Sequence, residues 1–420
     1  MGPAYRAAAR VLHRLPYPRG TLAASLAGRR AALARWRAWA ADARGDGPLI
    51  WAHAASVGES LVLQPVVARL RAGSRHLRVV LTHTSPSVAA HTPLRDFART
   101  DYLPLDEPGP MAAVLDALRP ALLLFSRGDL WPELVAGAAA RGIPVAVAGG
   151  MVGPRSARLR VPAVWALRPM HRLVGWVGAA SDGDADRWRR LGVPPDRVTV
   201  TGDPRHDQVA DRLPDLRLAA RWRSGPRGAA LTMVAGSIEA ADDGLLAEAA
   251  RRAGAAWRWL VVPHDPGPRR VEQVEAAFRR RGVAAARWDA ESPPPAAEVA
   301  VVARQGLLAD LYWAADAAYV GGGFRPGGLH AVCEPAVVAL PIAAGPFLST
   351  VRDGALLERA GGIGPVADAD TLVSRLDAWA ASPTRRWHDG LAARGALEAG
   401  AARRTVEALG RLAGARDDPA

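Results

Sequence analysis

The chain lacks lysine and asparagine altogether, has a single cysteine, and contains no long run of apolar residues. With Cys333 alone, no disulfide can form within the chain, which agrees with a reducing compartment. No segment approaches the roughly 20 uninterrupted apolar residues of a membrane-spanning helix, and no apolar signal region follows the basic N-terminus. Because the codons of lysine and asparagine both begin with AA, a GC-rich genome is the simplest cause of their absence. Arginine and aspartate can then take their roles.

The composition is that of a globular protein with two or three domains, since half of the 420 residues are hydrophobic and 23% are charged. The formal net charge is +13. This charge favours an anionic partner, such as a phosphorylated substrate or an anionic membrane surface, although codon bias alone also raises the arginine content. No basic stripe with interleaved aromatic residues is present, so we expect no nucleic-acid partner.

The first 45 residues form a basic segment that we expect to be helical and amphipathic. Over residues 22–41, arginines at 29, 30, 35 and 37 accompany large apolar residues. Leucine and tryptophan beside arginine suit the boundary of an anionic lipid layer. An ordinary amphipathic helix packed on its own domain has the same pattern, so both interpretations stay open. The apolar positions are Leu22, Leu26, Leu33, Trp36 and Trp39.

Beyond Leu49, short strands rich in valine, leucine and alanine alternate with helices. This alternation predicts an α/β fold with parallel sheets covered on both faces. We expect two Rossmann-like, doubly wound domains that face a cleft, with ligands at the carboxyl ends of the strands. The predicted parts are an N-terminal segment 1–45, a domain 46–212, a linker 213–227, a domain 228–385 and C-terminal helices 386–420. The predicted strands lie near 49–53, 77–82, 121–126, 144–148, 173–177 and 198–201, then near 230–235, 258–262, 298–302, 317–320 and 341–344.

A glycine-rich turn at residues 321–328 follows a predicted buried strand and precedes a helix predicted over 330–339. Glycines let backbone N–H groups approach a ligand, and a helix N-terminus attracts negative charge. Glu334, early in that helix, can accept hydrogen bonds from sugar hydroxyls. The pattern suits an activated sugar that carries a phosphate. A glycine-rich loop that only makes a turn has the same appearance.

Candidate catalytic residues follow strands of the first domain. Glu59, in the turn Ser56–Ser60, can act as a general base toward an attacking hydroxyl, although Ser56 and Glu59 also have the spacing of a helix-capping box. Asp129 follows the strand near 121–126 and can converge on the same site, or can simply cap the next helix. Arg205 closes the domain and can stabilise a carboxylate or a departing phosphate, unless it belongs to a plain surface turn.

Further candidates follow strands of the second domain. Gly236 and Ser237 come after its first strand, with an acidic pair at Asp242 and Asp243 in the next helix. His264 comes after its second strand and can contact a phosphate or a base, although a loop histidine without a role is the simpler interpretation of this residue taken alone. The histidines and Cys333 show no metal-ligand spacing, so we infer no zinc site. No Walker-type lysine loop is present.

These turns, in this order from about Trp51 to Gly362, resemble the 3-deoxy-D-manno-octulosonic acid (Kdo) transferases, glycosyltransferases of the GT-B type that act on lipid A. The family's Ser-x-Gly-Glu turn matches residues 56–59, and its acidic-aliphatic-Trp-Pro motif matches 129–132. Its Thr-Gly-Asn-x-Lys-x-Asp turn matches 201–207. The Gly-Ser loop with an acidic pair, the Pro-His loop at 263–264 and the Val-Gly-Gly loop that ends in Glu-Pro, at 320–335, complete the series.

The resemblance implies that Glu59 is the catalytic base and that Asp129 and Arg205 stabilise the transition state. It implies an acceptor site that includes Ser56 and Gly58. It implies a cytidine nucleotide held by the second domain, through Gly236, Ser237, Pro263, His264, Gln305, Gly306, Leu307, Gly322, Gly323, Ala331, Val332, Cys333 and Glu334.

The implied reaction is an inverting transfer of Kdo from CMP-Kdo to a hydroxyl of a lipid A precursor. The resemblance implies no metal and no redox cofactor. It places the enzyme at the cytoplasmic face of the inner membrane, either peripheral or anchored through its N-terminal segment.

The chain departs from the family pattern at several positions. Arg205 and Asp203 stand for lysine and asparagine, as the codon bias predicts, and Asp129 is one methylene shorter than the usual glutamate. Arg127 replaces an acid, and an arginine that often precedes the loop histidine is absent. Gly149–Met151 replace an Asn-x-Arg motif, and Ala331 replaces an asparagine. These changes leave two alternatives open: another GT-B enzyme, either a transferase for a different nucleotide sugar or an epimerase, and a non-catalytic relic that binds lipid or nucleotide.

Overall fold

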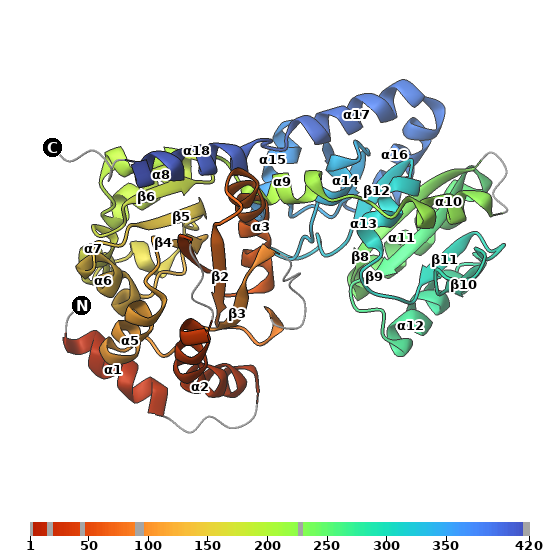
Figure 1. Ribbon diagram of the computed structural model, residues 1–420. Coiled ribbons are helices and arrows are strands. Elements are labelled where there is room, and N and C mark those ends of the chain that lie inside the picture. Colours follow the sequence, from red (N-terminus) through yellow and green to blue (C-terminus); the bar gives the residue numbers. More distant parts are fainter. Residues whose placement is uncertain (1–2, 15–19, 43–46, 89–95, 226–229, 415–420) are drawn as a thin grey trace. The chain divides into compact units, whose positions relative to one another are not determined.

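The computed structural model describes residues 3–14, 20–42, 47–88, 96–225 and 230–414. The chain divides into two compact units, an N-terminal unit of Met1–Asp211 with Glu398–Ala420 and a C-terminal unit of Arg212–Leu397. Each unit contains one parallel sheet of seven strands with helices on both faces (Figure 1). The predicted α/β class with two doubly wound sheets is confirmed.

The strands of the N-terminal unit form because short apolar runs are buried on both faces, as in β4, whose five residues are all buried. Their order in the sheet is β3-β2-β1-β4-β5-β6-β7. The strands are β1 (Leu49–His53), β2 (Arg78–His83), β3 (Arg99–Tyr102), β4 (Leu122–Ser126), β5 (Val145–Gly150), β6 (Trp176–Ala179) and β7 (Val198–Val200).

Two apolar layers cover this sheet. One layer contains residues of α2, α5, α6 and α8, and the other contains residues of α3 and α18. The α-helices of the unit are α1 (Pro3–Arg14), α2 (Thr21–Asp42), α3 (Val57–Gly73), α5 (Pro108–Leu118), α6 (Pro132–Ala140), α7 (Ala163–His171), α8 (Asp182–Leu191), α9 (Pro204–Asp211) and α18 (Ala401–Gly414). The described part of the unit also contains the short 3-10 helices η2 (Ala157–Leu159) and η3 (Pro195–Arg197).

The helix α2 packs against the N-terminal unit. It does so with part of the apolar face, within residues 22–41, that we considered as a possible contact with lipid. Leu26 and Trp36 are buried, and the Trp36 indole donates a hydrogen bond to the carbonyl of Tyr102 in β3. Arg29 is buried as well and donates to the carbonyl oxygens of Leu103 and Pro104. Leu26, Arg29 and Trp36 therefore pack as in an ordinary amphipathic helix, whereas Leu22 at the start of α2 is exposed. No described helix is long and apolar enough to cross a membrane.

The C-terminal unit repeats this architecture with the strand order β10-β11-β9-β8-β12-β13-β14. Its strands are β8 (Leu231–Ile238), β9 (Trp257–Pro263), β10 (Ala285–Trp288), β11 (Val299–Val302), β12 (Ala317–Val320), β13 (Ile342–Ala344) and β14 (Ile363–Pro365). Its α-helices are α10 (Leu216–Ser224), α11 (Ala240–Ala253), α12 (Pro268–Arg279), α13 (Leu308–Leu311), α14 (Cys333–Val337), α15 (Arg352–Arg359), α16 (Ala369–Ala381) and α17 (Pro383–Gly395). The 3-10 helices are η4 (Gly254–Ala256), η5 (Tyr312–Ala314) and η6 (Leu348–Thr350).

Several predicted boundaries need correction. The expected linker 213–227 is largely the helix α10, because Leu218 and Trp222 lie one turn apart and both are buried in the C-terminal unit. Three short strands, β3, β10 and β14, were not predicted, since their charged or glycine-containing sequences carry little strand signal. The strand expected at 173–177 is β6, three residues further on, and the helix expected over 330–339 is the five-residue α14.

The strand orders decide where ligands can bind. In the N-terminal sheet the direction of winding reverses between β1 and β4, and in the C-terminal sheet it reverses between β8 and β12. At such a point the loops after two neighbouring strands leave in opposite directions and open a crevice at the carboxyl ends. The turn with Glu59 and the turn with Asp129 follow β1 and β4, and the two glycine-containing turns follow β8 and β12.

Candidate active site

Glu59 lies where the direction of winding of the N-terminal sheet reverses, between β1 and β4. We call this place the switch point of the sheet. The residue belongs to the first turn of α3. Ser56 caps this helix by accepting a hydrogen bond from the Glu59 N–H at 3.4 Å, while the Glu59 carboxylate accepts one from the Ala55 N–H at 2.9 Å. The hydroxyl of Ser126, at the end of β4, donates to the Glu59 carbonyl at 2.8 Å. The predicted capping role is thus present. It also fixes the backbone of Glu59 and leaves its carboxylate at the edge of a cavity.

The surroundings of Glu59 make its carboxyl a stronger base than an exposed one. Burial raises its pKa, and the nearby negative charge of Asp129 adds to the rise. The hydrogen bond from Ala55 and the positive charges of Arg127 and Arg158 work in the other direction, but the net shift is upward. A base with a raised pKa takes up a proton more readily, as general base catalysis near neutral pH requires.

The cavity beside Glu59 has a volume of about 470 Å³. Two carboxylates, two arginines and several apolar side chains surround it, so it offers both charge and an apolar wall. The lining residues are Ala55, Glu59, Arg127, Gly128, Asp129, Leu130, Met151, Arg158, Leu167 and Met170.

Asp129 does not cap the following helix, because the N-cap of α6 is Trp131. The Trp131 indole, which can only donate, bonds to Nε2 of His53 at 3.0 Å. His53 therefore carries its proton on Nδ1 and donates it to the Thr82 hydroxyl at 2.9 Å. Asp129 lies 3.6 Å from the same Nε2. Burial acts to raise the pKa of Asp129, but His53 and Trp131 hold it below its usual range. The Asp129 carboxylate also lines the cavity.

Arg127 and Arg158 bring positive charge to this cavity, and our interpretation of the sequence did not assign either to the site. Arg127 has a left-handed backbone and pairs with the buried Asp203 at 2.8 Å. Arg158 comes from η2 and donates to the Gly128 carbonyl at 2.7 Å. The Arg-Gly-Asp turn after β4 is a signal that points to Arg127. Arg158 lies eight residues beyond β5 in a segment without a motif, so nothing in the sequence marks it.

Arg205 lies in the first turn of α9, a helix that packs on α3. Its backbone N–H donates to Asp203 at 2.9 Å. A Cβ at Gly58 would lie 3.9 Å from the Arg205 guanidinium, so this cation sits next to the residue that precedes Glu59. Arg205 is not among the residues that line the cavity. The turns after β1, β4 and β7 thus bring Ser56, Gly58, Glu59, Asp129 and Arg205 to one edge of the sheet.

At the switch point of the C-terminal sheet, the buried Asp242 ties two loops together. Its carboxylate accepts hydrogen bonds from the Glu239 N–H at 2.7 Å, from the Gly322 N–H at 3.1 Å and from the Tyr319 hydroxyl at 2.7 Å. Burial raises the pKa of Asp242 despite these bonds. One side chain thereby fixes both the loop after β8 and the glycine-rich loop after β12.

Gly322, which we assigned to the nucleotide site, has a left-handed backbone with φ of +81°. A Cβ there would collide with the carbonyl oxygen of Gly328, whereas Gly327, with φ of +72°, has open space around it. We expect Gly322→Ala to lower the free energy of unfolding by about 2–4 kcal/mol, since backbone strain and overpacking add. Gly327→Ala, the matched control, should cost only about 1 kcal/mol of strain. Chemical denaturation measures both, and equal costs would contradict this account.

Gly236 has a structural reason to be glycine, since a Cβ there would collide with the hydroxyl of the buried Tyr312. The next residue, Ser237, has a left-handed backbone with φ of +52°. Together they turn the chain from β8 toward α11. Their glycine-serine signal therefore marks the turn, and any contact with a nucleotide comes in addition to that role.

A cluster of two imidazoles and an ion pair lies at the same edge. The His264 ring stacks on His330 with 4.2 Å between ring centroids. His330 Nε2 lies 3.0 Å from Glu239, which also pairs with Arg325 at 2.9 Å. Burial and the neighbouring His264 lower the pKa of His330. Pro263 is buried at the end of β9, and His264 is exposed.

The remaining predicted nucleotide residues differ in exposure. Gln305 and Gly306 are exposed after β11, and Leu307 caps the short α13. Gly323 is buried against Gly345. These residues follow strands at the carboxyl edge, as predicted.

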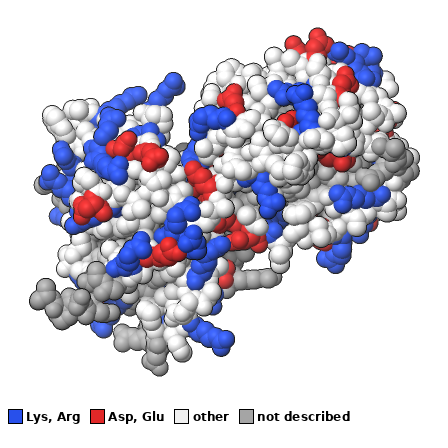
Figure 2. Space-filling model, turned by 90° about the horizontal axis from the view of Figure 1, so that it is seen from above, with Lys and Arg blue, Asp and Glu red and all other residues white. Residues whose placement is uncertain are grey.

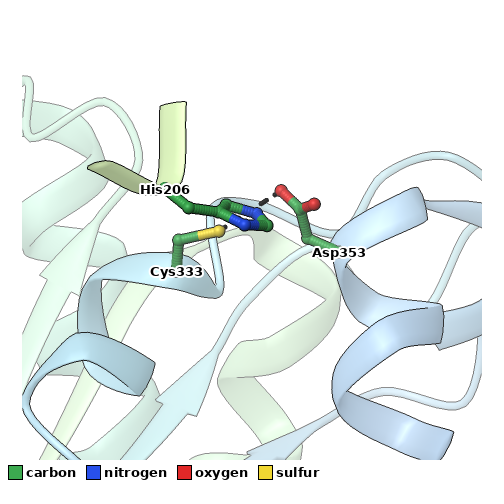
Figure 3. A group of neighbouring side chains, drawn as sticks. All are labelled: His206, Cys333 and Asp353. Atoms are coloured by element: carbon green, nitrogen blue, oxygen red, sulfur yellow. Dashed lines mark hydrogen bonds between the residues drawn. The ribbon is translucent and has the colours of Figure 1, made fainter. Parts of the chain in front are cut away.

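In the segment 331–334, Ala331 is exposed, Glu334 is half-buried, and Val332 and Cys333 pack into the core. The Cys333 thiol donates to the Asp353 carboxylate at 3.3 Å, a pair drawn in Figure 3. The third side chain drawn there, His206, belongs to the N-terminal unit, and a thiol and one carboxylate are fewer ligands than a structural zinc site needs. Because Val332 and Cys333 point inward, they can meet a nucleotide only through their backbone. The five-residue α14 is too short to supply the strong helix dipole that we expected here.

Comparison with known proteins supplies the family. The family model described as 3-deoxy-D-manno-octulosonic-acid transferase (kdotransferase) matches residues 28–208. The chain is similar to the 3-deoxy-D-manno-octulosonic acid transferase of Bordetella pertussis, with 32% identity over 389 residues, 88% of this chain and 89% of the relative. The transferase of Haemophilus influenzae is 26% identical over 70% of each chain.

Among solved structures, the fold is similar to that of UDP-GlcNAc 2-epimerase from Neisseria meningitidis. The TM-score is 0.63 with 14% identity, over 86% of this chain and 100% of the epimerase. A structure described as UDP-N-acetylglucosamine 2-epimerase has a TM-score of 0.60 with 14% identity over 90% of this chain. At this identity the similarity describes the fold alone.

Proposed function

This chain belongs to the 3-deoxy-D-manno-octulosonic acid transferase family of glycosyltransferases, and we propose that it transfers Kdo from CMP-Kdo to a hydroxyl of a lipid A precursor. The observation that carries this proposal is the carboxylate of Glu59, which has a raised pKa and borders a cavity with a second carboxylate and two arginines. A sugar transfer to a hydroxyl needs a base at the acceptor and compensation for the charges of donor and acceptor.

In the proposed reaction, Glu59 removes the proton from the acceptor hydroxyl while the hydroxyl oxygen attacks the anomeric carbon of Kdo. The bond from that carbon to the phosphate oxygen breaks, and CMP leaves with the electron pair. Attack opposite the leaving group inverts the configuration. Arg158, Arg127 and Arg205 are the cations available to the carboxylate of Kdo, the phosphates of a lipid A precursor and the departing CMP. The reaction needs no redox cofactor, and we propose that no metal takes part.

We propose that the C-terminal unit binds the cytidine nucleotide. The loops that Asp242 holds, together with His264 and Glu334, offer backbone N–H groups, an imidazole and a carboxylate at one sheet edge. These groups suit a phosphate and ribose hydroxyls. The enzyme would act at the cytoplasmic face of the inner membrane, where a lipid acceptor is presented.

Nucleotide titration tests the donor site separately from the chemistry. We expect calorimetry to show binding of CMP at least tenfold tighter than binding of UDP. Preference for UDP would favour another nucleotide-sugar enzyme of the same fold, such as an epimerase. Absence of binding by either nucleotide would contradict the assignment of the C-terminal site.

The pH dependence of the transfer rate tests the state of Glu59. The carboxylate form is active, so the rate falls as the pH drops through the pKa of Glu59, and because that pKa is raised, the fall begins at a higher pH than for an exposed glutamate. The positive charge of Arg158 lowers this pKa, so Arg158→Gln should shift the acidic limb of the profile upward.

Arg155→Gln is the matched control, because Arg155 is exposed in the same segment and does not line the cavity. A pH–rate profile measured with a detergent-dispersed acceptor reports both variants. An acidic limb that stays in place in Arg158→Gln, or that moves equally in both, would contradict the proposed coupling.

A further inference from the structure

The helix α7 presents two different faces. Leu167 and Met170 line the cavity beside Glu59. On the opposite side, Trp165, Arg168 and the C-cap residue Arg172 follow one another at helical spacings of three or four residues, and all are exposed. Val161, in the turn just before the helix, is exposed as well. Val161 is 63% exposed and Trp165 is 67% exposed. Large apolar side chains this exposed, within one stripe, indicate a partner that the isolated chain lacks.

The charged residues of the chain segment that carries this stripe are of one sign. Residues 134–181 contain no aspartate and no glutamate. Arg160, Arg168 and Arg172 are exposed, and none pairs with a carboxylate of the described chain. The neighbouring helix α8 exposes Asp182 and Asp186, of which Asp186 pairs with Arg189 at 2.9 Å. Over much of the face drawn in Figure 2, by contrast, arginines and carboxylates are interspersed.

We propose that the α7 surface, formed by Arg160, Val161, Trp165, Arg168, Arg172 and Leu173, docks on the headgroup region of an anionic lipid bilayer. Tryptophan has an apolar body and a polar N–H and suits the interface between headgroups and acyl chains. The unpaired guanidinium groups meet lipid phosphates, each contributing roughly fivefold to the partition coefficient. This inference rests on the proposed function for its purpose, since docking through α7 brings the cavity on its other face close to a lipid acceptor.

In this proposal the α7 surface, and not the N-terminal helix considered from the sequence, contacts the anionic lipid layer. The predicted apolar face of α2 is buried at Leu26 and Trp36. Among the described side chains of α1 and α2, the exposed large apolar ones are Val11 and Leu22, at 62% and 54%. They offer an alternative point of contact that the experiment must separate from α7.

Vesicle sedimentation of the full chain tests this proposal without requiring activity. The vesicles contain phosphatidylcholine alone or with 30% phosphatidylglycerol. We expect Trp165→Ala to weaken binding to the anionic vesicles about tenfold, and the double variant Arg168→Gln, Arg172→Gln about 20-fold. The matched controls lie on α17, where Trp387 is 65% exposed and Arg394 is exposed. Trp387→Ala and Arg394→Gln should bind as the unchanged protein does.

Activity measurements separate this proposal from the proposed function. Both α7 variants should keep CMP affinity and transfer to a detergent-dispersed acceptor, and should lose transfer to an acceptor embedded in vesicles. Absence of transfer in every format would contradict the proposed function, while the sedimentation results would still stand. Unchanged binding by the α7 variants, failure of the unchanged protein to bind anionic vesicles, or loss of binding only in Val11→Ser with Leu22→Ser would each overturn the α7 proposal.

Discussion

Replacing Glu59 by glutamine should lower the rate of Kdo transfer by about 10²–10⁴-fold, the usual contribution of a general base. The amide cannot take the proton of the acceptor hydroxyl. It has nearly the same shape, and its oxygen can still accept the hydrogen bond that the Glu59 carboxylate receives from Ala55 at 2.9 Å. The affinity for CMP should stay unchanged, because Glu59 belongs to the other unit from the proposed nucleotide site. Turnover measured beside CMP titration reports both quantities.

The matched control is Asp116→Asn, which changes a carboxylate to an amide at an exposed ion pair with Arg141 in the same unit. This variant should transfer Kdo at the rate of the unchanged protein. If Glu59→Gln kept its rate, the base would lie elsewhere, and Asp129 would be the first residue to examine at this cavity. If Glu59→Gln also lost CMP binding, the loss of rate would not identify a base.

Replacing Asp242 by alanine should have the largest effect on stability, about 3–5 kcal/mol. The change leaves the buried Gly322 N–H, the buried Tyr319 hydroxyl and the partly buried Glu239 N–H without their acceptor, and each unsatisfied buried group costs about 1–3 kcal/mol. Because the same carboxylate holds the Gly322 loop, CMP affinity should fall as well. Chemical denaturation of the full chain and CMP titration measure the two effects.

Two neighbouring variants serve as controls for Asp242→Ala. Asp243→Ala removes a mostly buried, bidentate ion pair with Arg270 but leaves no backbone N–H group without its acceptor, so it should cost about 1–2 kcal/mol, less than Asp242→Ala. Asp242→Asn should cost less than the alanine variant, since its carbonyl oxygen can accept from the two N–H groups while Tyr319 turns its hydroxyl to accept from the amide. Equal losses of unfolding free energy in Asp242→Ala and Asp243→Ala would contradict the proposed importance of the hydrogen bonds to Asp242.

The sequence predicts the two sheets well because buried parallel strands are short apolar runs, as Leu122–Ser126 illustrates. It also predicts the turns with Glu59 and Asp129, since polar residues directly after such runs must lie at the carboxyl edge. The edge strands β3 and β10 escape prediction because they contain arginines and are only partly buried. The face of α2 that meets the sheet could not be identified from periodicity, because an interfacial helix and a packed helix share the same pattern.

Sequence motifs identify only some of the arginines at the site. Arg205 is found because it follows a recognisable turn. Arg158 reaches the cavity from η2 through the hydrogen bond to the Gly128 carbonyl, a contact that depends on the path of a loop and has no local signature. In the same way, the role of Asp242 becomes visible only when the loops after β8 and β12 are placed next to each other. The acidic pair in the sequence indicates an acid there but does not show which of Asp242 and Asp243 makes the hydrogen bonds to the two loops.

The measurement that tests the central claim most directly follows CMP-Kdo and a tetraacylated lipid A precursor together, with the purified protein and with Glu59→Gln. CMP release and the mass of the lipid product are recorded in the same reaction. We predict CMP release only when the lipid is present, a product heavier by one or more Kdo residues, and loss of both signals in Glu59→Gln. CMP release without any change in the lipid, or an unmodified lipid in the presence of bound CMP-Kdo, would contradict the assignment of this chain as a lipid-directed Kdo transferase.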